Sequence, residues 1–219
     1  MVMSSEVLRG EFINKFNTDR NKCITILLTI DVHKYKPKPL EERENIILFI
    51  DGRRRRNLGF ALEVFKHVKS IVSDVKLIVV GRVEDIKVNG VEYVGYIPRD
   101  RLRELYSKAM VLLTPSGYEG FGYPAIEASA SGTPTVGSNA IPQEVLVDGV
   151  NGFRIPIFNP KVYVTKLVEL IKNDELWGEL HRKCIEHAKQ IHIDKIINEH
   201  LKLCSYYAKR RYIQLYDRK

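Results

Sequence analysis

Two glutamates stand eight positions apart in a glycine-rich stretch, "SGYEGFGYPAIEASASGTP", at residues 116–134. Glycine adopts positive φ at little cost and lets backbone N–H groups approach a ligand closely. Pro124 suits the first position of a helix, and Gly132 with Pro134 suits its end, so we expect a helix of about two turns over 124–131. The N-terminus of this helix would point at the ligand of the loop, which favours an anion such as a phosphate.

The carboxylates of Glu119 and Glu127 have different expected places. Glu127 lies on the first helical turn, on the same face as Pro124, where it can reach a ligand of the loop and bind two adjacent ribose hydroxyls. Glu119 lies in the loop itself. A structural alternative stays open, because an acid on a first turn often interacts only with the helix dipole, and a glycine-rich loop is often only a turn. A glycosidase with two working carboxylates is disfavoured, because it has no need of a phosphate-like loop.

Four successive arginines, residues 53–56, follow shortly after an apolar run, "IILFI" (46–50). The planar guanidinium of arginine suits a diphosphate because it makes two charge-assisted hydrogen bonds at once. We expect at least one of Arg53 and Arg56 to contact the ligand, with the two arginines between them as bystanders. The alternative is that all four form a solvated surface patch.

Short apolar runs alternate with helical patterns through most of the chain. Continuous Val, Ile and Leu runs are typical of strands buried on both faces, so the alternation predicts an α/β fold with a doubly wound parallel sheet. The expected strands cover residues 24–30, 46–50, 76–80, 91–94, 109–113, 134–137 and 152–155. In such a sheet ligands bind beyond the carboxyl ends of the strands, so segments 51–57, 95–100 and 115–124 should meet at one edge.

Other segments carry structural expectations. Residues 58–72 predict a helix with one apolar face that covers the sheet. The turn signals in "DGVNG" (148–152) are interpreted as structural. After about residue 160 the pattern is helical throughout. The first 40 residues differ, with a helix over about 5–17, a strand, and an extended linker, "DVHKYKPKP" (31–39), whose prolines exclude helix.

Composition limits the function classes. The chain has 219 residues, 44% of them hydrophobic, and a formal net charge of +8. The charge fits an anionic small molecule, an anionic membrane surface, a polyanion or solubility alone, but no basic stripe interleaved with aromatics indicates nucleic-acid binding. The apolar runs are far shorter than the roughly 20 residues that a membrane helix needs. Three cysteines without zinc spacing indicate a reducing, cytoplasmic location and no metal site.

Residues 118–155, "YEGFGYPAIEASASGTPTVGSNAIPQEVLVDGVNGFRI", resemble the signature of the family 4 glycosyltransferases. The usual form is E-G-F-G-L-P-x-x-E-A-M-A-x-G-x-P-V-V, followed by E-V and D-G-x-N-G. Residues 44–82 resemble the family segment in which G-R, and then a lysine before Gly or Asn, open the first helix. The resemblance covers about residues 24–200 and implies the donor-binding, C-terminal domain of a GT-B fold, whose first domain binds the acceptor.

This resemblance also implies a division of the chain. Residues 1–40 would be a remnant of the acceptor-side domain and the linker, residues 41–197 the Rossmann-like nucleotide-sugar-binding domain, and residues 198–219 a C-terminal crossover helix with a basic tail.

The resemblance implies roles for individual residues. Glu119 would lie beside the donor sugar and Glu127 would bind the nucleotide ribose. Arg53 matches the diphosphate-binding arginine of the family motif. Direct counting from Gly52 puts Leu58 at the position of the second basic residue, but a leucine could not neutralise a diphosphate. If this chain has a two-residue deletion relative to the motif, Arg56 takes that position instead. Two further expectations concern the backbone and the base: Gly120, Phe121, Gly122 and Tyr123 would offer N–H groups to the sugar and phosphate, and Gly95 would lie near the base.

The implied chemistry is a retaining sugar transfer from a nucleotide-diphosphate sugar, without a metal ion or other cofactor. The partner would be an acceptor-binding domain or a separate chain, which normally supplies the family's catalytic histidine. The expected location is cytoplasmic, with peripheral contact to the inner membrane face left open. A non-catalytic or regulatory nucleotide-sugar-binding module is the alternative, and nucleic-acid binding through the arginines is the weakest hypothesis.

Overall fold

The computed structural model describes residues 1–51, 57–82, 86–156 and 159–216, with the backbone alone for residues 210–216. The chain forms two compact units. One comprises Met1–Asp31 with Gln190–Lys219, and the other comprises Val32–Lys189. The predicted residues Arg53 and Arg56 lie outside the described residues.

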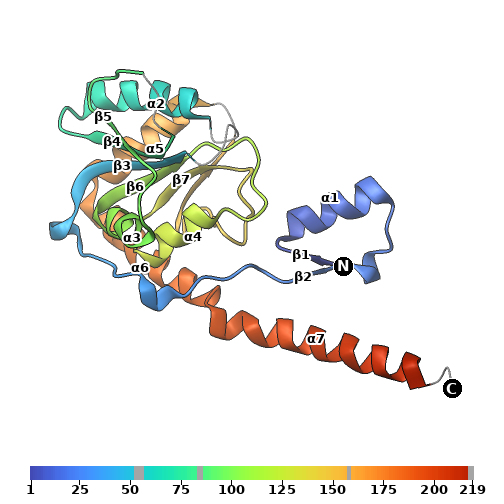
Figure 1. Ribbon diagram of the computed structural model, residues 1–219. Helices are drawn as coiled ribbons and strands as arrows, with labels where there is room; N and C mark the ends of the chain where they lie inside the picture. Colours follow the sequence, from blue (N-terminus) through green and yellow to red (C-terminus); the bar gives the residue numbers. More distant parts are fainter. Residues whose placement is uncertain (52–56, 83–85, 157–158, 217–219) are drawn as a thin grey trace. The chain divides into compact units, whose positions relative to one another are not determined.

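The larger unit is built on a six-stranded sheet in the order β5-β4-β3-β6-β7-β8, and every pair of neighbouring strands is parallel (Figure 1). The two central strands, β3 and β6, pair with Leu48 opposite Leu112. The predicted parallel sheet is confirmed, so the segments that follow β3, β5 and β6 leave from the same edge. The strands are β3 (Glu44–Asp51), β4 (Lys76–Gly81), β5 (Val91–Gly95), β6 (Ala109–Thr114), β7 (Thr135–Ser138) and β8 (Gly152–Ile155).

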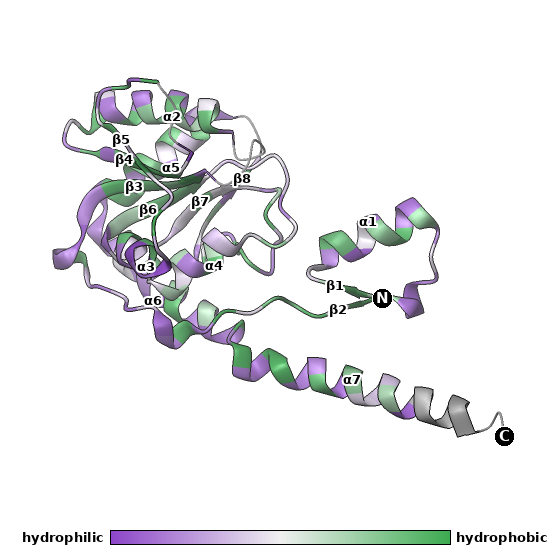
Figure 2. Ribbon diagram, in the orientation of Figure 1, coloured by the Kyte–Doolittle hydropathy of each residue, from purple (hydrophilic) through white to green (hydrophobic). Residues whose placement is uncertain are grey.

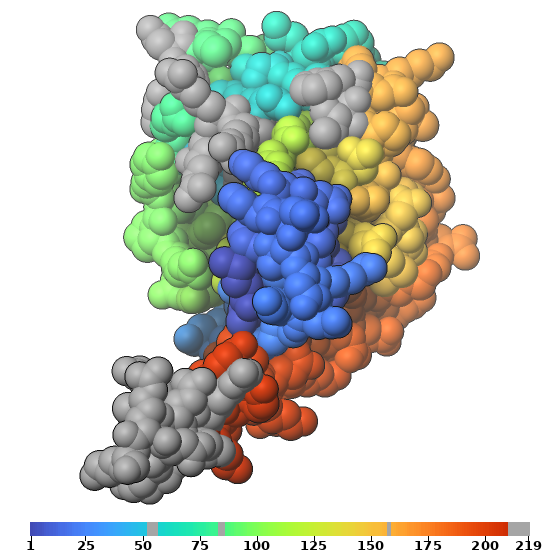
Figure 3. Space-filling view, turned by 90° about the vertical axis from the view of Figure 1, so that its right-hand side faces the viewer, coloured from blue at the N-terminus to red at the C-terminus, as the bar shows by residue number. Residues whose placement is uncertain are grey.

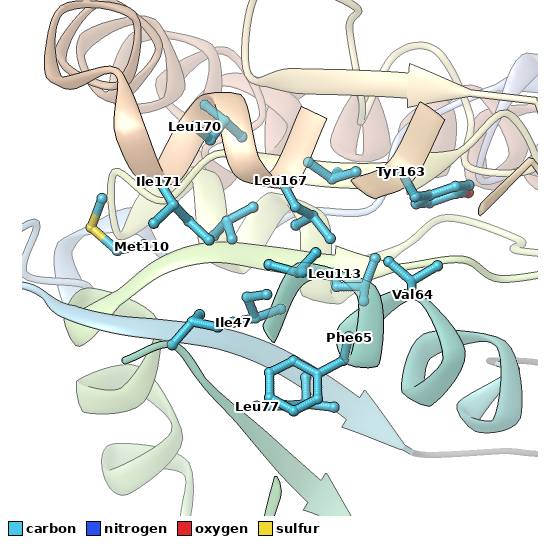
Figure 4. Close-up of a cluster of buried hydrophobic side chains, with 14 of the residues drawn as sticks. Ile47, Val64, Phe65, Leu77, Met110, Leu113, Tyr163, Leu167, Leu170 and Ile171 are labelled. Carbon is cyan, nitrogen blue, oxygen red and sulfur yellow. The ribbon is translucent and has the colours of Figure 1, made fainter. Parts of the chain in front are cut away.

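Helices cover both faces of this sheet, because alternate residues of its apolar strands point to opposite sides. Helices α2 (Leu58–Ile71) and α5 (Pro160–Lys172) lie side by side, α2 in cyan and α5 in orange (Figures 1 and 3). Figure 4 shows Phe65 of α2 and Leu167 of α5 in one buried cluster with Ile47 of β3. The central strands are strongly hydrophobic along their length (Figure 2). Ile71, expected on the covered face of its helix, is half exposed because it ends the helix.

The opposite face of the sheet carries α3 (Arg99–Lys108) and α4 (Tyr123–Ala130). Tyr106 of α3 and Ala128 of α4 pack on Leu48 and Leu112 in a second buried cluster. Helix α6 (Asp174–Gln190) follows α5 and buries Trp177, Leu180 and Cys184. The predicted doubly wound arrangement is therefore present. Two of the segments predicted to meet at the ligand edge, 95–100 and 115–124, lead into α3 and α4 on the same face of the sheet.

The smaller unit holds short elements and one long helix. Strand β1 (Val2–Met3) pairs in parallel with β2 (Ile24–Thr25), and α1 (Glu6–Phe16) begins at Ser5, whose hydroxyl accepts a hydrogen bond from the N–H of Leu8. The predicted strand over 24–30 is wrong beyond its first two residues, because its neighbour β1 offers only two residues to pair with. The final helix, α7, covers Ile193–Tyr216. Within the described residues, no helix is long and apolar enough to cross a membrane.

The turn before β8 is held by a fully buried asparagine. The side chain of Asn151 accepts from the N–H of Val147 at 2.8 Å and donates to the carbonyl of Val145 at 2.8 Å and to the hydroxyl of Ser129, on α4, at 2.9 Å. The turn closes where Gly149 N–H bonds the carbonyl of Gly152. It thereby ties the end of the sheet to α4.

Gly152 and Gly149 form a matched pair for testing this turn. A Cβ on Gly152, at φ +147°, would lie 1.9 Å from the carbonyl oxygen of Thr135, whereas a Cβ on Gly149, at φ +69°, would meet open space. We expect Gly152→Ala to lower the free energy of unfolding by about 3 kcal/mol or more and Gly149→Ala by about 1 kcal/mol, measured by urea denaturation. Equal effects of the two substitutions would contradict the close approach at Gly152.

Candidate functional site

The best-defined polar group at the predicted site is the carboxylate of Glu127. The residue was expected on the first turn of its helix, but it is the fifth residue of α4 and lies on the second turn, because the helix begins at Tyr123. The residue is 7% exposed, yet its two oxygens are hydrogen-bonded on both sides. Tyr35 donates to Oε1 at 3.1 Å, and Tyr106 of α3 donates to Oε2 at 3.1 Å. The guanidinium of Arg99 lies 3.4 Å from Oε1 with a side chain that is 75% exposed. The two tyrosines therefore orient this buried carboxylate, while the exposed Arg99, its most distant partner, can be replaced by a ligand.

Two effects keep the Tyr35 hydroxyl a donor. Burial, and then the negative charge of Glu127, raise the pKa of Tyr35 above its usual range. The same two causes raise the pKa of Tyr123, which lies at the start of α4. Because a carboxylate offers about four acceptor positions, Glu127 can bind a further hydroxyl if Arg99 moves away.

Glycine shapes the loop that precedes α4. Gly122 adopts φ +99° and occupies the N-cap position, and no described side chain caps the helix. A Cβ on Gly122 would come within 3.1 Å of Ile141. Phe121 is buried and packs edge-on against the ring of Tyr123, with ring centroids 5.3 Å apart. An uncapped helix start with a positive dipole is suited to an anion.

Glu119 lies nearby in the chain but in different surroundings. Its Oε1 accepts a hydrogen bond from the hydroxyl of Ser116 at 3.0 Å, and this hydroxyl lies 3.3 Å from that of Thr114. Ser138, at the end of β7, donates to the carbonyl of Ser116. Glu119 is thus positioned by hydroxyl groups at the carboxyl ends of the central strands.

Two other predicted segments reach the same edge of the sheet. Asn57, next to the undescribed residues 52–56, donates to the carbonyl of Pro115 at 2.9 Å, which joins the start of α2 to the loop after β6. Gly95 ends β5 with φ +68° and is followed by Tyr96, which is 76% exposed. The structure thus brings the ends of β3, β5 and β6 to one edge, although the assignment of individual residues to a ligand stays a prediction.

Sequence reasoning did not identify Tyr35 and Tyr106 as partners of Glu127. Tyr35 lies 92 positions away in the linker-like segment, and Tyr106 lies on α3 among charged residues. No spacing in the sequence connects either tyrosine with Glu127. Arg99, in contrast, belongs to the segment 95–100 that the strand order had already brought to this edge.

The opposite end of α4 is held by Arg43. Its guanidinium donates to Ser131 O at 2.7 Å, at the end of α4, and to Ala109 O at 2.7 Å, at the end of α3. It also stacks over the ring of Trp177 at 4.7 Å. Burial lowers the pKa of Arg43 to about 10, so the group keeps its charge at neutral pH. One cation therefore meets the negative ends of both helices that supply Glu127 and its partner Tyr106.

Comparison with known proteins identifies the family. Residues 31–191 match the family model described as glycosyl transferases group 1. The chain belongs to the glycosyl transferases group 1 family. The matched range holds the whole six-stranded sheet and every described residue of the candidate site.

Relatives of this family member are longer. The chain is 37% identical over 98 residues to a D-inositol 3-phosphate glycosyltransferase from Streptomyces bingchenggensis, which is 44% of this chain and 22% of that protein. The chain spans less than half the length of the curated relatives that it matches.

Two solved structures resemble the chain. TarM of S. aureus, in a mutant form solved with fondaparinux, alpha-GlcNAc-glycerol and UDP, has a TM-score of 0.81 and 22% identity, over 92% of this chain and 43% of that protein. HepE of Anabaena, solved with UDP and glucose, has a TM-score of 0.80 and 15% identity, over 94% of this chain and 62% of that protein. The predicted GT-B type of fold is confirmed.

The Arg43 contacts predict a large cost for a conservative substitution. Lysine keeps the charge but not the planar fork, so Arg43→Lys should leave buried carbonyls at both helix ends unpaired and lower the free energy of unfolding by about 2–3 kcal/mol. Hydrogen exchange of the amides at the end of α4 should accelerate as well. The matched control is Arg154→Lys, since Arg154 donates to two carbonyls in a more exposed place and its loss should cost under about 1 kcal/mol. A cost at Arg43 no larger than that at Arg154 would contradict this assignment.

Proposed function

We propose that this chain is the donor-binding half of a retaining glycosyltransferase, which moves a sugar from a nucleotide-diphosphate sugar to an acceptor without a metal ion. One observation carries the proposal: the buried, doubly hydrogen-bonded Glu127 carboxylate lies on α4, the helix that follows β6, one turn beyond the uncapped start of that helix. This places a hydroxyl-binding acid beside an anion-binding helix terminus, which is what a nucleoside diphosphate requires.

Each part of the donor then has a counterpart in the chain. The Glu127 carboxylate accepts from the ribose hydroxyls after Arg99 yields its position. Backbone N–H groups of Gly120, Phe121, Gly122 and Tyr123 face the diphosphate. Three other assignments rest on the family signature alone: Arg53 and Arg56 neutralise the diphosphate, Gly95 lies by the base, and Glu119 lies beside the sugar.

The names of the similar structures support the class of ligand. TarM was solved with UDP, and HepE with UDP and glucose. UDP is the product that a UDP-sugar leaves in a donor site after its sugar has been transferred, and glucose is an example of such a sugar. We extend the class, a nucleotide-diphosphate sugar, to this chain, and leave the base and sugar open.

In the proposed mechanism, the bond between the anomeric carbon and the diphosphate oxygen breaks as the acceptor oxygen bonds the same carbon. The departing diphosphate takes the bonding electron pair, and its phosphate oxygen receives the proton of the acceptor. Cationic side chains and helix N–H groups that are already oriented stabilise the developing charge. The acceptor enters from the side of the leaving group, so the anomeric configuration is retained. The acceptor-binding domain or partner chain supplies the remaining contacts.

The role of Glu127 is tested by binding of UDP or GDP to the full chain. Glu127→Gln keeps the size of the side chain but replaces an acceptor oxygen by a donor, so we expect affinity for the matching nucleotide to fall by about tenfold to a hundredfold. Isothermal titration measures this loss, and thermal unfolding shows whether the variant stays folded.

The matched control is Glu119→Gln. Its carboxylate is assigned to the sugar, so the nucleotide without sugar should bind this variant as it binds the natural chain. If neither nucleotide binds the natural chain at millimolar concentration, or if both variants bind equally well, the donor-site proposal fails.

The reaction class is tested by the fate of the donor. Incubated with the matching α-linked nucleotide sugar, the chain should release free sugar slowly and in the α configuration, which ¹H NMR detects before the anomers equilibrate. Glu119→Gln should slow this release by about tenfold to a hundredfold with little change in nucleotide affinity. Release of the β anomer would contradict retention, and nucleotide binding with no turnover of any donor would favour a non-catalytic module.

A further inference from the structure

A cavity of about 310 Å³ lies between α3 and the segment 34–38. Four cationic side chains line it: Lys34, Lys36, Lys38 and Arg103. None of the residues assigned above to the donor lines this cavity, which we call the basic pocket.

The local sequence explains why lysines gather here. The segment reads K-Y-K-P-K-P. Contrary to the predicted extended linker, its first lysine ends a short 3-10 helix, Val32–Lys34, and only the residues after it, with their two prolines, form no regular element before residue 40. Tyr35 is buried and bonded to Glu127, whereas Lys36 is exposed and lines the pocket. The guanidinium of Arg103 lies over the ring of Tyr35, 5.6 Å from its centroid, which holds this cation on the wall of the pocket.

Two acids also line the pocket, but both are already paired. Asp100 bonds Arg103. Glu104 lies 3.1 Å from Lys108 and 3.2 Å from Arg101, and the hydrogen bond from Lys108 lowers its pKa, so it stays ionised. Asp100 thus offsets the charge of Arg103, and Glu104 interacts with Lys108, Arg101 and the charge of Lys38, but the four cations of the pocket still outnumber its two acids.

The lysines differ in how they are held. Lys38 pairs with Glu42 at 3.0 Å, with 57% of the glutamate side chain exposed, so water and ions can replace this contact. Lys36 has no ion pair or hydrogen bond with any residue in the described part of the chain. The pocket therefore has a surplus of positive charge in a preformed hollow, which lowers the cost of ordering on binding.

We propose that the basic pocket is a second anion site, which binds the phosphate group of a phosphorylated ligand apart from the donor. Lysine binds phosphate as a compact charge with three N–H donors, and Arg103 adds a planar fork. Free phosphorylated compounds and lipid headgroups share this chemistry. The site does not depend on the proposed transferase function.

The first test titrates the full chain with inorganic pyrophosphate by calorimetry, with UDP present to occupy the proposed donor site. The double substitution Lys34→Gln with Lys36→Gln should weaken pyrophosphate binding by about tenfold or more, because two charge-assisted contacts are lost. The matched control, Lys66→Gln with Lys172→Gln, removes the same charge from exposed positions of the same unit and should change affinity by less than about twofold. Thermal unfolding confirms that both pairs remain folded.

The second test separates the sources of the phosphate. The same proteins are sedimented with phosphatidylcholine vesicles that carry phosphatidic acid. If the natural chain sediments with the vesicles but does not bind pyrophosphate, and only the Lys34→Gln, Lys36→Gln double variant loses the vesicles, the site binds a lipid headgroup. If the natural chain binds pyrophosphate but does not sediment with the vesicles, the site binds a free phosphorylated ligand. The proposal is overturned if the natural chain binds neither probe or if both variant pairs lose binding equally. UDP affinity, measured separately on each protein, reports on the donor site alone.

Discussion

The Arg43 guanidinium is the cation on which the arrangement of α3 and α4 depends. Its nitrogens donate to carbonyls at the ends of both helices, and Trp177 covers its face while donating to Met110 O at 2.8 Å from β6. A mostly buried charge is stable only when its donors are satisfied, and here the acceptors are main-chain carbonyls and the hydroxyl of Thr133 rather than a carboxylate. The positions of both helix ends are therefore fixed together, because moving either one would leave a charged donor unpaired.

This constraint extends along α4 to Glu127. Glu127 and Tyr106 meet only because α4 and α3 are held in register, and the 3.1 Å contact between them places the carboxylate. Asn151 adds a second tie, from the turn before β8 to Ser129 on α4. The short helix thus has a fixed C-terminal half, while its N-terminal end, shaped by Gly122, carries no side-chain cap. Rigid support at one end and a helix N-terminus without a side-chain cap at the other are what a preorganised anion site needs.

The sequence predicted the sheet well because its central strands are continuous apolar runs with helices between them, and parallel pairing then brings the ends of β3, β5 and β6 to one edge. The prediction of a strand over 24–30 was wrong for most of its length, because this equally apolar run pairs only with the two-residue strand β1. Glu127 was predicted as a site residue from an expected place on the first turn of α4, although the structure has it on the second turn. Tyr35 and Arg43 were not, since their roles depend on contacts 92 and 88 positions away that no local spacing records.

The segment 34–38 gains its importance from these long-range contacts. From its sequence alone, K-Y-K-P-K is typical of a solvated linker. In the structure, however, Tyr35 binds this segment to the Glu127 carboxylate, which we assign to the ribose. The tyrosine is fixed from both sides, by Glu127 through its hydroxyl and by Arg103 against its ring. Because Arg103 also lines the basic pocket, Tyr35 contacts one residue of each of the two polar sites. Tyr35 therefore supports two places in the fold at once, since its hydroxyl orients the Glu127 carboxylate and its ring positions the Arg103 guanidinium.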